Sequence, residues 1–366
     1  MVMKFCSNGS EYIQSLIDNA KKDGTNKAVI TGNYEIEKTI LIPSDFYLVL
    51  ENCHLRMASN TFCNMFTNES CYTEKGKTLE GTDCNITIEG RGKAILDGGE
   101  FNGLSEATSR KDGYPPVYVN NVLLFTNVDG FKITGLHIRN QRWWAMNFIC
   151  CRHGRIRDID FLADYTRIDE NGNRVPGLIY TYGPEKGGAC VVNADGIDIR
   201  CGCHDIIIED ITGFTEDDTV AITSIKGKME RELGVEELLD GIHNIIVRNV
   251  NTSALCSMVR LLNQGGSKLY NILIDGIIDS SKDSKYMERG GTGIRVGDTY
   301  MYGKVHSTAD DCYNITIKNV YSRALAVMRI AGEMKNCHFE NINGFDGNEV
   351  YIENNSTMDI EQFFKN

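Results

Sequence analysis

Three aspartates stand at a spacing that could serve hydrolysis. The stretch VVNADGIDI (191–199) contains Asp195, and 22 residues further on TEDDTVAI (215–222) contains Asp217 and Asp218. Carboxylates repel one another and resist burial, yet both groups adjoin apolar runs typical of buried strands. An enzyme that hydrolyses a glycosidic bond needs one protonated carboxyl as acid and another carboxylate to activate water. The spacing is therefore informative if the fold brings the three carboxylates together.

A short pattern of alternating apolar residues followed by Asn, Asp or Gly recurs along the chain. Its equivalent positions, 22 to 52 residues apart, are Ile88, Ile133, Ile156, Ile208, Val247, Ile274, Ile317 and Phe339. A unit of 22–27 residues with Asn or Gly at its corners is typical of a right-handed parallel β-helix, whose coils stack at roughly 4.8 Å. Longer intervals would be two coils, or one coil with a loop. Leucine-rich repeats are the competing interpretation, but their LxxLxL register is missing.

The sequence as a whole predicts one β-helical domain over residues 1–366, with an N-terminal cap at about 1–30 and coils at about 31–355. Residues 10–21 predict a short amphipathic helix, N-capped by Ser10, that covers the open end of the stack. A hydrophobic content of 42%, with 36 glycines and five prolines, fits a mainly β protein with a continuous core.

Composition also bounds location and partners. No apolar run is long enough for a signal peptide or a membrane span, and the 13 cysteines are interpreted as reduced thiols. Both features favour the cytoplasm. The formal charge of −12 disfavours a non-specific nucleic-acid binder. We expect no nucleic-acid and no membrane partner, and the sequence does not indicate an oligomeric state.

A second strand follows each reference position by about 13 residues and predicts two columns of side chains on one side of the helix. The first column comprises Asn147, Asp198, Ala221, Arg260, Arg295 and Arg329. The second column, three positions earlier, comprises Trp144, Asp195, Asp218, Ser257, Thr292 and Ala326. Asp195 and Asp218 are thus predicted to lie one coil apart with Asp217 beside them, so the spacing noted above is one turn of the coil.

Other members of these columns are candidate substrate-binding residues. Arg260 and Arg295 could hold an anionic group by charge-assisted, forked hydrogen bonds, and Asp198 shares their column. An alternative is that the acids and arginines pair with one another as a structural ladder. Trp143 and Trp144 could form a sugar-stacking platform, although one of them could equally fill the core; we assign Trp144 to the site.

Four segments resemble a known family. IEGRGKAILDGG (88–99), GLHIRNQRWWAMNF (135–148), NADGIDI and EDDTVAI occur in the order of the corresponding motifs in the polygalacturonase-like glycoside hydrolases of family 28. This family belongs to the pectin-lyase-like β-helix superfamily. The similarity covers roughly residues 86–332 and implies a β-helix enzyme that hydrolyses pectic galacturonides with inversion.

The resemblance also implies roles for individual residues. It identifies Asp217 as the general acid, with Asp195 and Asp218 positioning and deprotonating the water. Asn193 matches the asparagine of the first acidic motif and would orient the first acid. Arg295, in GIRVGD, matches the arginine of the family's RIK motif.

Two positions depart from the family's pattern. Ser257 stands where the family's GHG histidine is expected, and Gly297 replaces the lysine of RIK. In the family the histidine supports the proton of the acid and the lysine binds a substrate carboxylate. Both the pH behaviour and a strict galacturonate specificity are therefore open. We hypothesise that Arg260, Lys304 or His306 substitutes for the missing groups.

Two further features complete the prediction. The stretch CGCH (201–204) has a metal-like composition, but His153 and His243 also stand just before a strand, so a turn role is favoured. Residues 226–241 predict a short charged helix between coils, and long loops are expected at 100–121 and 163–189. Such loops could close one end of a groove and so favour short substrates or chain ends.

The sequence therefore predicts an inverting glycoside hydrolase acting on short acidic, uronate-containing, pectin-derived oligosaccharides. That chemistry requires no metal and no organic cofactor. A non-catalytic carbohydrate-binding β-helix is an alternative that the missing histidine and lysine would suit. A polysaccharide lyase is a third class, but it needs a basic proton abstractor, which an acid triad supplies poorly.

Overall fold

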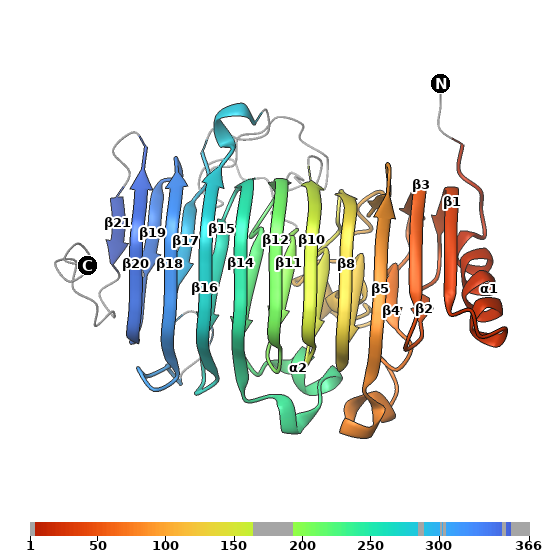
Figure 1. The fold of residues 1–366 in the computed structure, drawn as a ribbon, viewed down its shortest axis with the longest axis horizontal. Helices are drawn as coiled ribbons and strands as arrows, with labels where there is room; N and C mark the ends of the chain where they lie inside the picture. The colour runs from red at the N-terminus through yellow and green to blue at the C-terminus, as the bar shows by residue number, and fades with distance from the viewer. Residues whose placement is uncertain are drawn as a thin grey trace.

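The computed structural model describes residues 4–163, 193–284, 289–300, 302, 305–345 and 349–352. Within these residues the chain alternates between two parallel sheets, one of 11 and one of 10 strands, that stack coil upon coil (Figure 1). Every strand pairing between named strands is parallel, and successive strands of a sheet come from successive coils. This arrangement is a parallel β-helix, as predicted.

The larger sheet carries the longer strands. They are β1 Lys27–Ile36, β3 Tyr47–Met57, β5 Asp83–Arg91, β6 Ile95–Asp97, β8 Val128–Arg139, β10 Arg152–Leu162, β12 His204–Thr215, β14 Gly241–Ala254, β16 Lys268–Asp279, β18 Cys312–Ser322 and β20 Lys335–Gly344. The smaller sheet carries shorter strands. They are β2 Ile40–Ile42, β4 Phe66–Asn68, β7 Leu123–Thr126, β9 Met146–Ile149, β11 Ile197–Arg200, β13 Val220–Ser224, β15 Ser257–Asn263, β17 Thr292–Val296, β19 Ala326–Ile330 and β21 Glu349–Ile352.

Both predicted sets of equivalent positions are confirmed by the strand register. In the larger sheet, Ile88 pairs with Ile133, and each later reference position pairs with the next, through to Phe339. Each interval is therefore a single coil, and the longer ones contain insertions. The alternative of two coils per long interval is wrong. In the smaller sheet, the column from Asn147 to Arg329 pairs in the predicted order.

The core lies between the two sheets because side chains alternate along each strand. Ile197 and Ile199 of β11 are fully buried in the main apolar cluster, whereas Asp198 between them points to the outer face. The same alternation in β13 places Val220 and Ile222 in the core. The repeating pattern thus forces the intervening column onto one outer surface, where the candidate site lies.

The corners of the coils are built from residues that accept a left-handed backbone. Asn244, Asn271 and Asn314 have φ of 55°, 56° and 55°, a region that asparagine tolerates better than most residues. The Asn271 amide donates to the Asn244 carbonyl oxygen at 3.0 Å, and the Asn314 amide to that of Asn271 at 3.1 Å. A ladder of amides therefore links this corner in three consecutive coils.

Helix α1 (Gly9–Lys22) covers the N-terminal end of the stack, as predicted, with Ile13 and Ile17 fully buried against the core (Figure 1). The predicted cap is wrong. Asn8 occupies the N-cap position, while the Ser10 hydroxyl accepts hydrogen bonds from the backbone N–H groups of Glu37 and Lys38, both at 3.0 Å. Ser10 instead ties the helix to the first coil.

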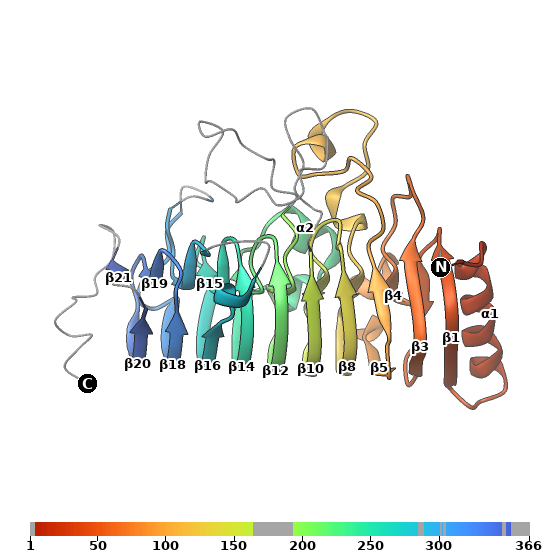
Figure 2. The same ribbon diagram turned by 90° about the horizontal axis from the view of Figure 1, so that it is seen from above.

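The predicted insertion helix is confirmed. Helix α2 (Lys228–Leu233) lies in the connection between β13 and β14 and is labelled in Figures 1 and 2. Several 3-10 turns also lie in connections: Lys75–Lys77, Leu79–Gly81, Thr108–Arg110, Val117–Val119, Glu236–Leu238 and Ser281–Asp283. The connection between β6 and β7 includes the predicted loop at 100–121, whereas most of the predicted loop at 163–189 lies outside the described residues. None of the helices in the described part of the chain has the length and apolar character that a membrane crossing requires.

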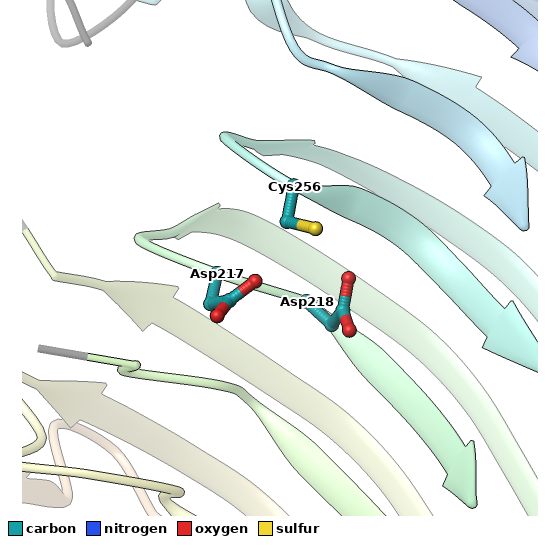
Figure 3. A group of neighbouring side chains, drawn as sticks. All are labelled: Asp217, Asp218 and Cys256. Carbon is teal, nitrogen blue, oxygen red and sulfur yellow. The ribbon is translucent and has the colours of Figure 1, made fainter. Parts of the chain in front are cut away.

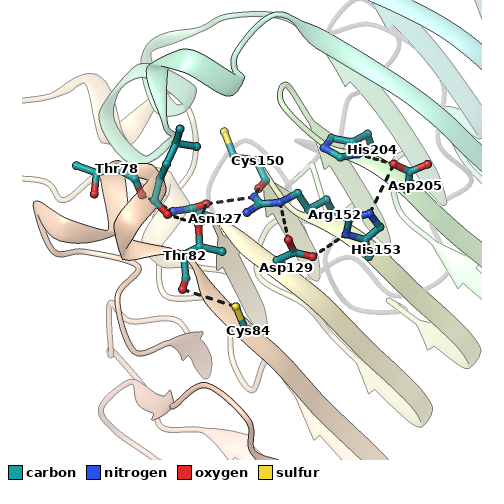
Figure 4. Close-up of polar contacts among 11 residues, drawn as sticks. Thr78, Thr82, Cys84, Asn127, Asp129, Cys150, Arg152, His153, His204 and Asp205 are labelled. Carbon is teal, nitrogen blue, oxygen red and sulfur yellow. Dashed lines mark hydrogen bonds and ion pairs between the residues drawn. The ribbon is translucent and has the colours of Figure 1, made fainter.

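The predicted histidines lie among the first residues of their strands, and His153 and His204 belong to a polar network at one corner (Figure 4). Nδ1 of His153 contacts Asp129 at 2.6 Å, and Nδ1 of His204 contacts Asp205 at 2.6 Å. The His204 ring stacks on His243 with centroids 4.8 Å apart, and the Cys203 thiol donates to a backbone carbonyl. These contacts support the favoured turn role for residues 201–204.

Candidate active site

The fold brings the three predicted carboxylates together. Asp195 directly precedes the turn into β11, and Asp217 and Asp218 precede β13, the neighbouring strand. The Asp218 backbone N–H donates to Oδ1 of Asp195 at 3.0 Å. Because β11 and β13 pair with Ile197 opposite Val220, this contact is set by strand register rather than by a mobile side chain.

Burial and mutual repulsion disfavour ionisation of this cluster. Burial, followed by the like charges of Asp198, Asp217 and Asp218, raises the pKa of Asp195 well above its usual range. Burial, followed by the charge of Asp218, raises the pKa of Asp217 to about 7. Asp217 is thus a carboxyl that still holds its proton near neutrality, the property required of a general acid.

The first column adds a guanidinium to the acids. Nη1 of Arg260 lies 3.3 Å from Oδ2 of Asp218, a residue that is fully buried. The other side of Arg260 contacts the hydroxyl and ring of Tyr302, with the guanidinium 5.1 Å from the ring centroid. The structural ladder is therefore present for the pair of Arg260 and Asp218, and the charge of Asp218 is compensated directly.

Cys256 was not identified from the sequence, although it belongs to the cluster (Figure 3). Its sulfur and one carboxylate oxygen each from Asp217 and Asp218 lie within 4.8 Å of one another. The signal was available, because Ser257 follows Asp218 in the same column and the residue before Ser257 must therefore lie beside Asp217. This is the one grouping in the described residues whose ligand atoms are close enough for a metal ion, but hydrolysis by acids needs none, and we assign none.

Asn193 does not orient Asp195 through its side chain. Its backbone is left-handed, with φ of 62°, and its amide donates to Oε1 of Glu106 at 3.2 Å. The backbone N–H of Asp218 orients Asp195 instead. Asn193 therefore ties the acidic motif to the loop at 100–121.

The Trp144 side chain is buried by its neighbours and is not exposed to a substrate. The indoles of Trp143 and Trp144 stack with centroids 3.8 Å apart, and the Arg200 guanidinium lies 4.7 Å from the Trp144 ring centroid. Arg200 in turn pairs with Glu230 of α2 at 2.7 Å. With only 8% of Trp144 exposed, both faces of its ring are covered, which leaves none open to a sugar.

Asp198 and Asn147 form a polar pair in neighbouring coils. Both are fully buried, and in the described part of the chain neither carboxyl oxygen of Asp198 has a hydrogen-bond partner. Burial raises the pKa of Asp198 well above its usual range, although Arg200 opposes the rise. The Asn147 amide points to Met229 of α2, with its nitrogen 3.5 Å from the sulfur. Asp198 thus adds a buried carboxyl whose ionisation is disfavoured beside the acids.

Arg260, Lys304 and His306 were suggested as substitutes for the histidine and lysine that the family pattern leads one to expect, and they do not all lie at the acids. Arg260 contacts the acids, as described above. Nδ1 of His306 lies 3.6 Å from Asp298, and its ring stacks on Tyr300 with centroids 3.5 Å apart. His306 therefore contacts residues that follow the C-terminal end of β17. Lys304 lies outside the described residues.

The backbone at Gly297 does not suit the lysine that the resemblance to the family led us to expect at this position. Its φ is +89°, and a Cβ atom would lie 2.0 Å from the carbonyl oxygen of Ala331 in the next coil. We expect Gly297→Lys to lower the free energy of unfolding by about 1–3 kcal/mol and to leave KM for acidic substrates no better. Gly297→Ala adds a Cβ atom but no charge and should also destabilise the protein. Comparing the melting temperatures of the two variants separates the effect of backbone strain from that of the added charge. A stable lysine variant with a lower KM would contradict this expectation.

Comparison with known proteins identifies the family of this chain. The model of glycosyl hydrolases family 28 matches residues 35–235, more than half of the chain. The chain belongs to this family. It is therefore a glycoside hydrolase, and the matched range includes all three aspartates but ends before Ser257 and Gly297. No curated protein is similar enough in sequence to count as a match.

Solved structures share the fold of this family 28 member. An endo-xylogalacturonan hydrolase from Aspergillus tubingensis has a TM-score of 0.57 at 12% identity, covering 97% of this chain and 94% of that one. An exopolygalacturonase from Thermotoga maritima has a TM-score of 0.54 at 14% identity, with coverages of 94% and 87%. Endopolygalacturonase I from Stereum purpureum has a TM-score of 0.52 at 14% identity, with coverages of 96% and 91%. At these identities the likeness shows the fold, a right-handed parallel β-helix.

Proposed function

We propose that this family 28 protein hydrolyses short, uronate-containing oligosaccharides of the pectin type, with inversion at the anomeric carbon. The observation that carries the proposal is the stacking of Asp195 under Asp218, with Asp217 beside them and its pKa raised to about 7. Membership of the family and the polygalacturonase-like fold support the substrate class. A cytoplasmic location stays a prediction.

In the proposed mechanism Asp217 acts as the acid. Its proton passes to the glycosidic oxygen as the bond from that oxygen to the anomeric carbon breaks. A water attacks the anomeric carbon from the opposite face, and its proton passes to the carboxylate that activates it. Asp218, whose charge is balanced by Arg260, is the better acceptor, and Asp195 helps to hold the water.

The distance between the acids bears on whether the configuration at the anomeric carbon is inverted or retained, so the stereochemistry of the product tests the proposed mechanism. Inverting enzymes usually separate acid and base by roughly 6.5–9.5 Å to admit water, whereas retaining enzymes use roughly 5–5.5 Å. Asp217 and Asp218 approach within 4.8 Å, so inversion requires the water to enter from the side of Asp195 in the neighbouring coil. Proton NMR of the first-formed anomer distinguishes the two outcomes.

The first experiment is a reducing-end assay of the purified protein against short acidic and neutral oligosaccharides, with Asp217→Asn as the control. Hydrolysis confined to acidic members, lost in the variant, would support the proposal. Binding of acidic sugars without hydrolysis would instead identify a non-catalytic carbohydrate-binding protein. Hydrolysis of neutral sugars alone would contradict the proposed substrate.

Arg295 should contribute to acidic-substrate binding. It pairs in register with Arg260 and lies one coil beyond it, on the same outer face. We expect Arg295→Ala to raise KM for an acidic oligosaccharide by about tenfold or more, because a charge-assisted hydrogen bond is lost, while a neutral substrate is affected far less. Arg329→Ala, one coil further on, is the matched control. Equal losses on both substrates would argue against a uronate at Arg295.

A further inference from the structure

Cys256 occupies the position next to the candidate acid in the adjacent coil. The Thr219 backbone N–H donates to the Ser257 carbonyl oxygen at 2.9 Å, which sets the two turns in register. Val220 pairs with Val259, and Asp217 and Cys256 each stand three residues before these positions, in equivalent connections between a long and a short strand. Register therefore places the thiol beside the Asp217 carboxyl, as Figure 3 shows.

Several polar groups contact the sulfur of Cys256. Nη1 of Arg295 donates toward the sulfur at 3.8 Å, and the Ser257 hydroxyl does so at 3.7 Å. The sulfur also lies within 4.8 Å of a carboxylate oxygen of Asp217. Because the sulfur accepts from Arg295 and Ser257, its single hydrogen can be donated to the carboxylate. Cys256 thus links the arginine of one coil to the acid of another.

We propose that Cys256 is a positioning residue for the general acid: its S–H donates to Asp217 and holds that carboxyl toward the scissile oxygen. The inference rests on the proposed function of Asp217. It supplies, by a different residue, the support for the acid that the family resemblance assigns to a histidine and that Ser257 cannot give alone.

The thiol does not act as a nucleophile in this arrangement. Burial, followed by the charges of Asp218 and Asp217, raises the pKa of Cys256 well above its usual range. The reactive thiolate is therefore scarce at neutral pH. A neutral S–H is what donation to a carboxylate requires, so the same surroundings that suppress nucleophilic attack favour the positioning role.

The hydrogen bond also acts on the proton of the acid. Burial and then Asp218 raise the pKa of Asp217, while Arg260, the Cys256 hydrogen bond and Arg295 oppose the rise. Among the described residues, Asp195 and Asp198 also face this cluster and disfavour further ionisation, while Arg200 acts on Asp198 and Tyr302 contacts Arg260. Removing the thiol should therefore leave Asp217 protonated to a higher pH and less well oriented.

The test compares Cys256→Ala with Cys256→Ser, which keeps a donor. Cys256→Ala should lower kcat by about tenfold with little change in KM, and should move the alkaline limb of the kcat profile upward by about half a unit to one unit. Cys256→Ser should recover most of kcat and return the limb toward that of the wild type. Cys312→Ala, which removes a fully buried thiol from β18, controls for packing.

A second readout does not depend on turnover. Infrared titration of the carboxylic C=O band, with Asp217→Asn as the reference, reports the protonation of Asp217 directly. The proposal predicts an upward shift of this titration in Cys256→Ala and not in Cys312→Ala. If the wild type hydrolyses no oligosaccharide but the shift is seen, the proposed function fails while the contact stands. An unchanged titration, or an unchanged kcat and pH limb in Cys256→Ala, would overturn the inference.

Discussion

Replacing Asp217 by Asn should lower kcat by on the order of 100- to 10,000-fold while the coil remains folded. Asparagine keeps the shape of the side chain but has no proton to give to the leaving oxygen. Since the predicted loss belongs to the chemical step, binding of an acidic oligosaccharide, measured by calorimetry, should change little. Unchanged hydrolysis in the variant would remove Asp217 from the mechanism.

The same substitution should change stability with a defined pH dependence. The pKa of Asp217 is raised from 3.8 to about 7 on folding, so the folded state retains a proton that the unfolded state releases. The stability that depends on this proton is fully present below the unfolded pKa and is lost as pH rises through about 7. An asparagine side chain cannot ionise. The melting temperature of Asp217→Asn should therefore exceed that of the wild type by a few degrees at pH 8 and by little at pH 4, on the order of 2–4 °C per kcal/mol.

Asp210→Asn is a control of opposite sign. A hydrogen bond from Asn249, followed by a hydrogen bond and the charge of Arg157, lowers the pKa of Asp210. Its stabilising effect is therefore present above the unfolded pKa and lost as pH falls. The control should be no more stable than the wild type at pH 8. If both variants gained stability equally, the gain from Asp217→Asn would reflect net charge rather than the local cluster.

Replacing Arg260 by Met should destabilise the protein by about 3–5 kcal/mol. Arg260 is the direct counterion of Asp218, whose side chain is 1% exposed, while that of Arg260 is 15% exposed. Removing the guanidinium leaves a buried carboxylate beside three further acids, whereas methionine preserves much of the apolar stem packing. The free energy of unfolding from urea titration measures this cost directly.

A double-mutant cycle separates this charge effect from packing. Asp218→Asn should relieve most of the loss in the Arg260→Met background, because no charge is then left unpaired. Both proteins should lack activity, since Asp218 is the proposed acceptor of the water proton. A loss below about 1 kcal/mol in Arg260→Met would mean that the pair is worth no more than an exposed ion pair.

The columns were predictable because strand register leaves little freedom. A one-residue shift in the strand register would turn Asp198 into the core and Ile197 out of it. Burying the carboxyl and exposing the apolar side chain would both be unfavourable, so the apolar pattern determines the register. Asp195, Asp217 and Asp218 therefore met as the spacing predicted. The same register also determines the position of Cys256, because the residue before Ser257 must lie beside Asp217.

The remaining differences concern side chains whose partners come from outside the repeat. Asn193 bonds to Glu106 in an insertion, and Trp144 is covered by Arg200, which α2 holds through Glu230. Such contacts depend on where irregular loops pack, and periodicity does not determine that. Ser10 differs for a similar reason, because its hydroxyl serves the first coil rather than its own helix.

The unequal intervals between coils carry a consequence for how such an enzyme diversifies. Positions separated by 22 residues and by 52 residues pair in the same way, so chain added between strands is absorbed without shifting the strands themselves. Each coil contacts mainly its neighbours, as in other solenoids. Segments grafted at these connections should therefore be able to alter which sugars reach the carboxylates while leaving the carboxylates in place, so that recognition and chemistry can evolve separately.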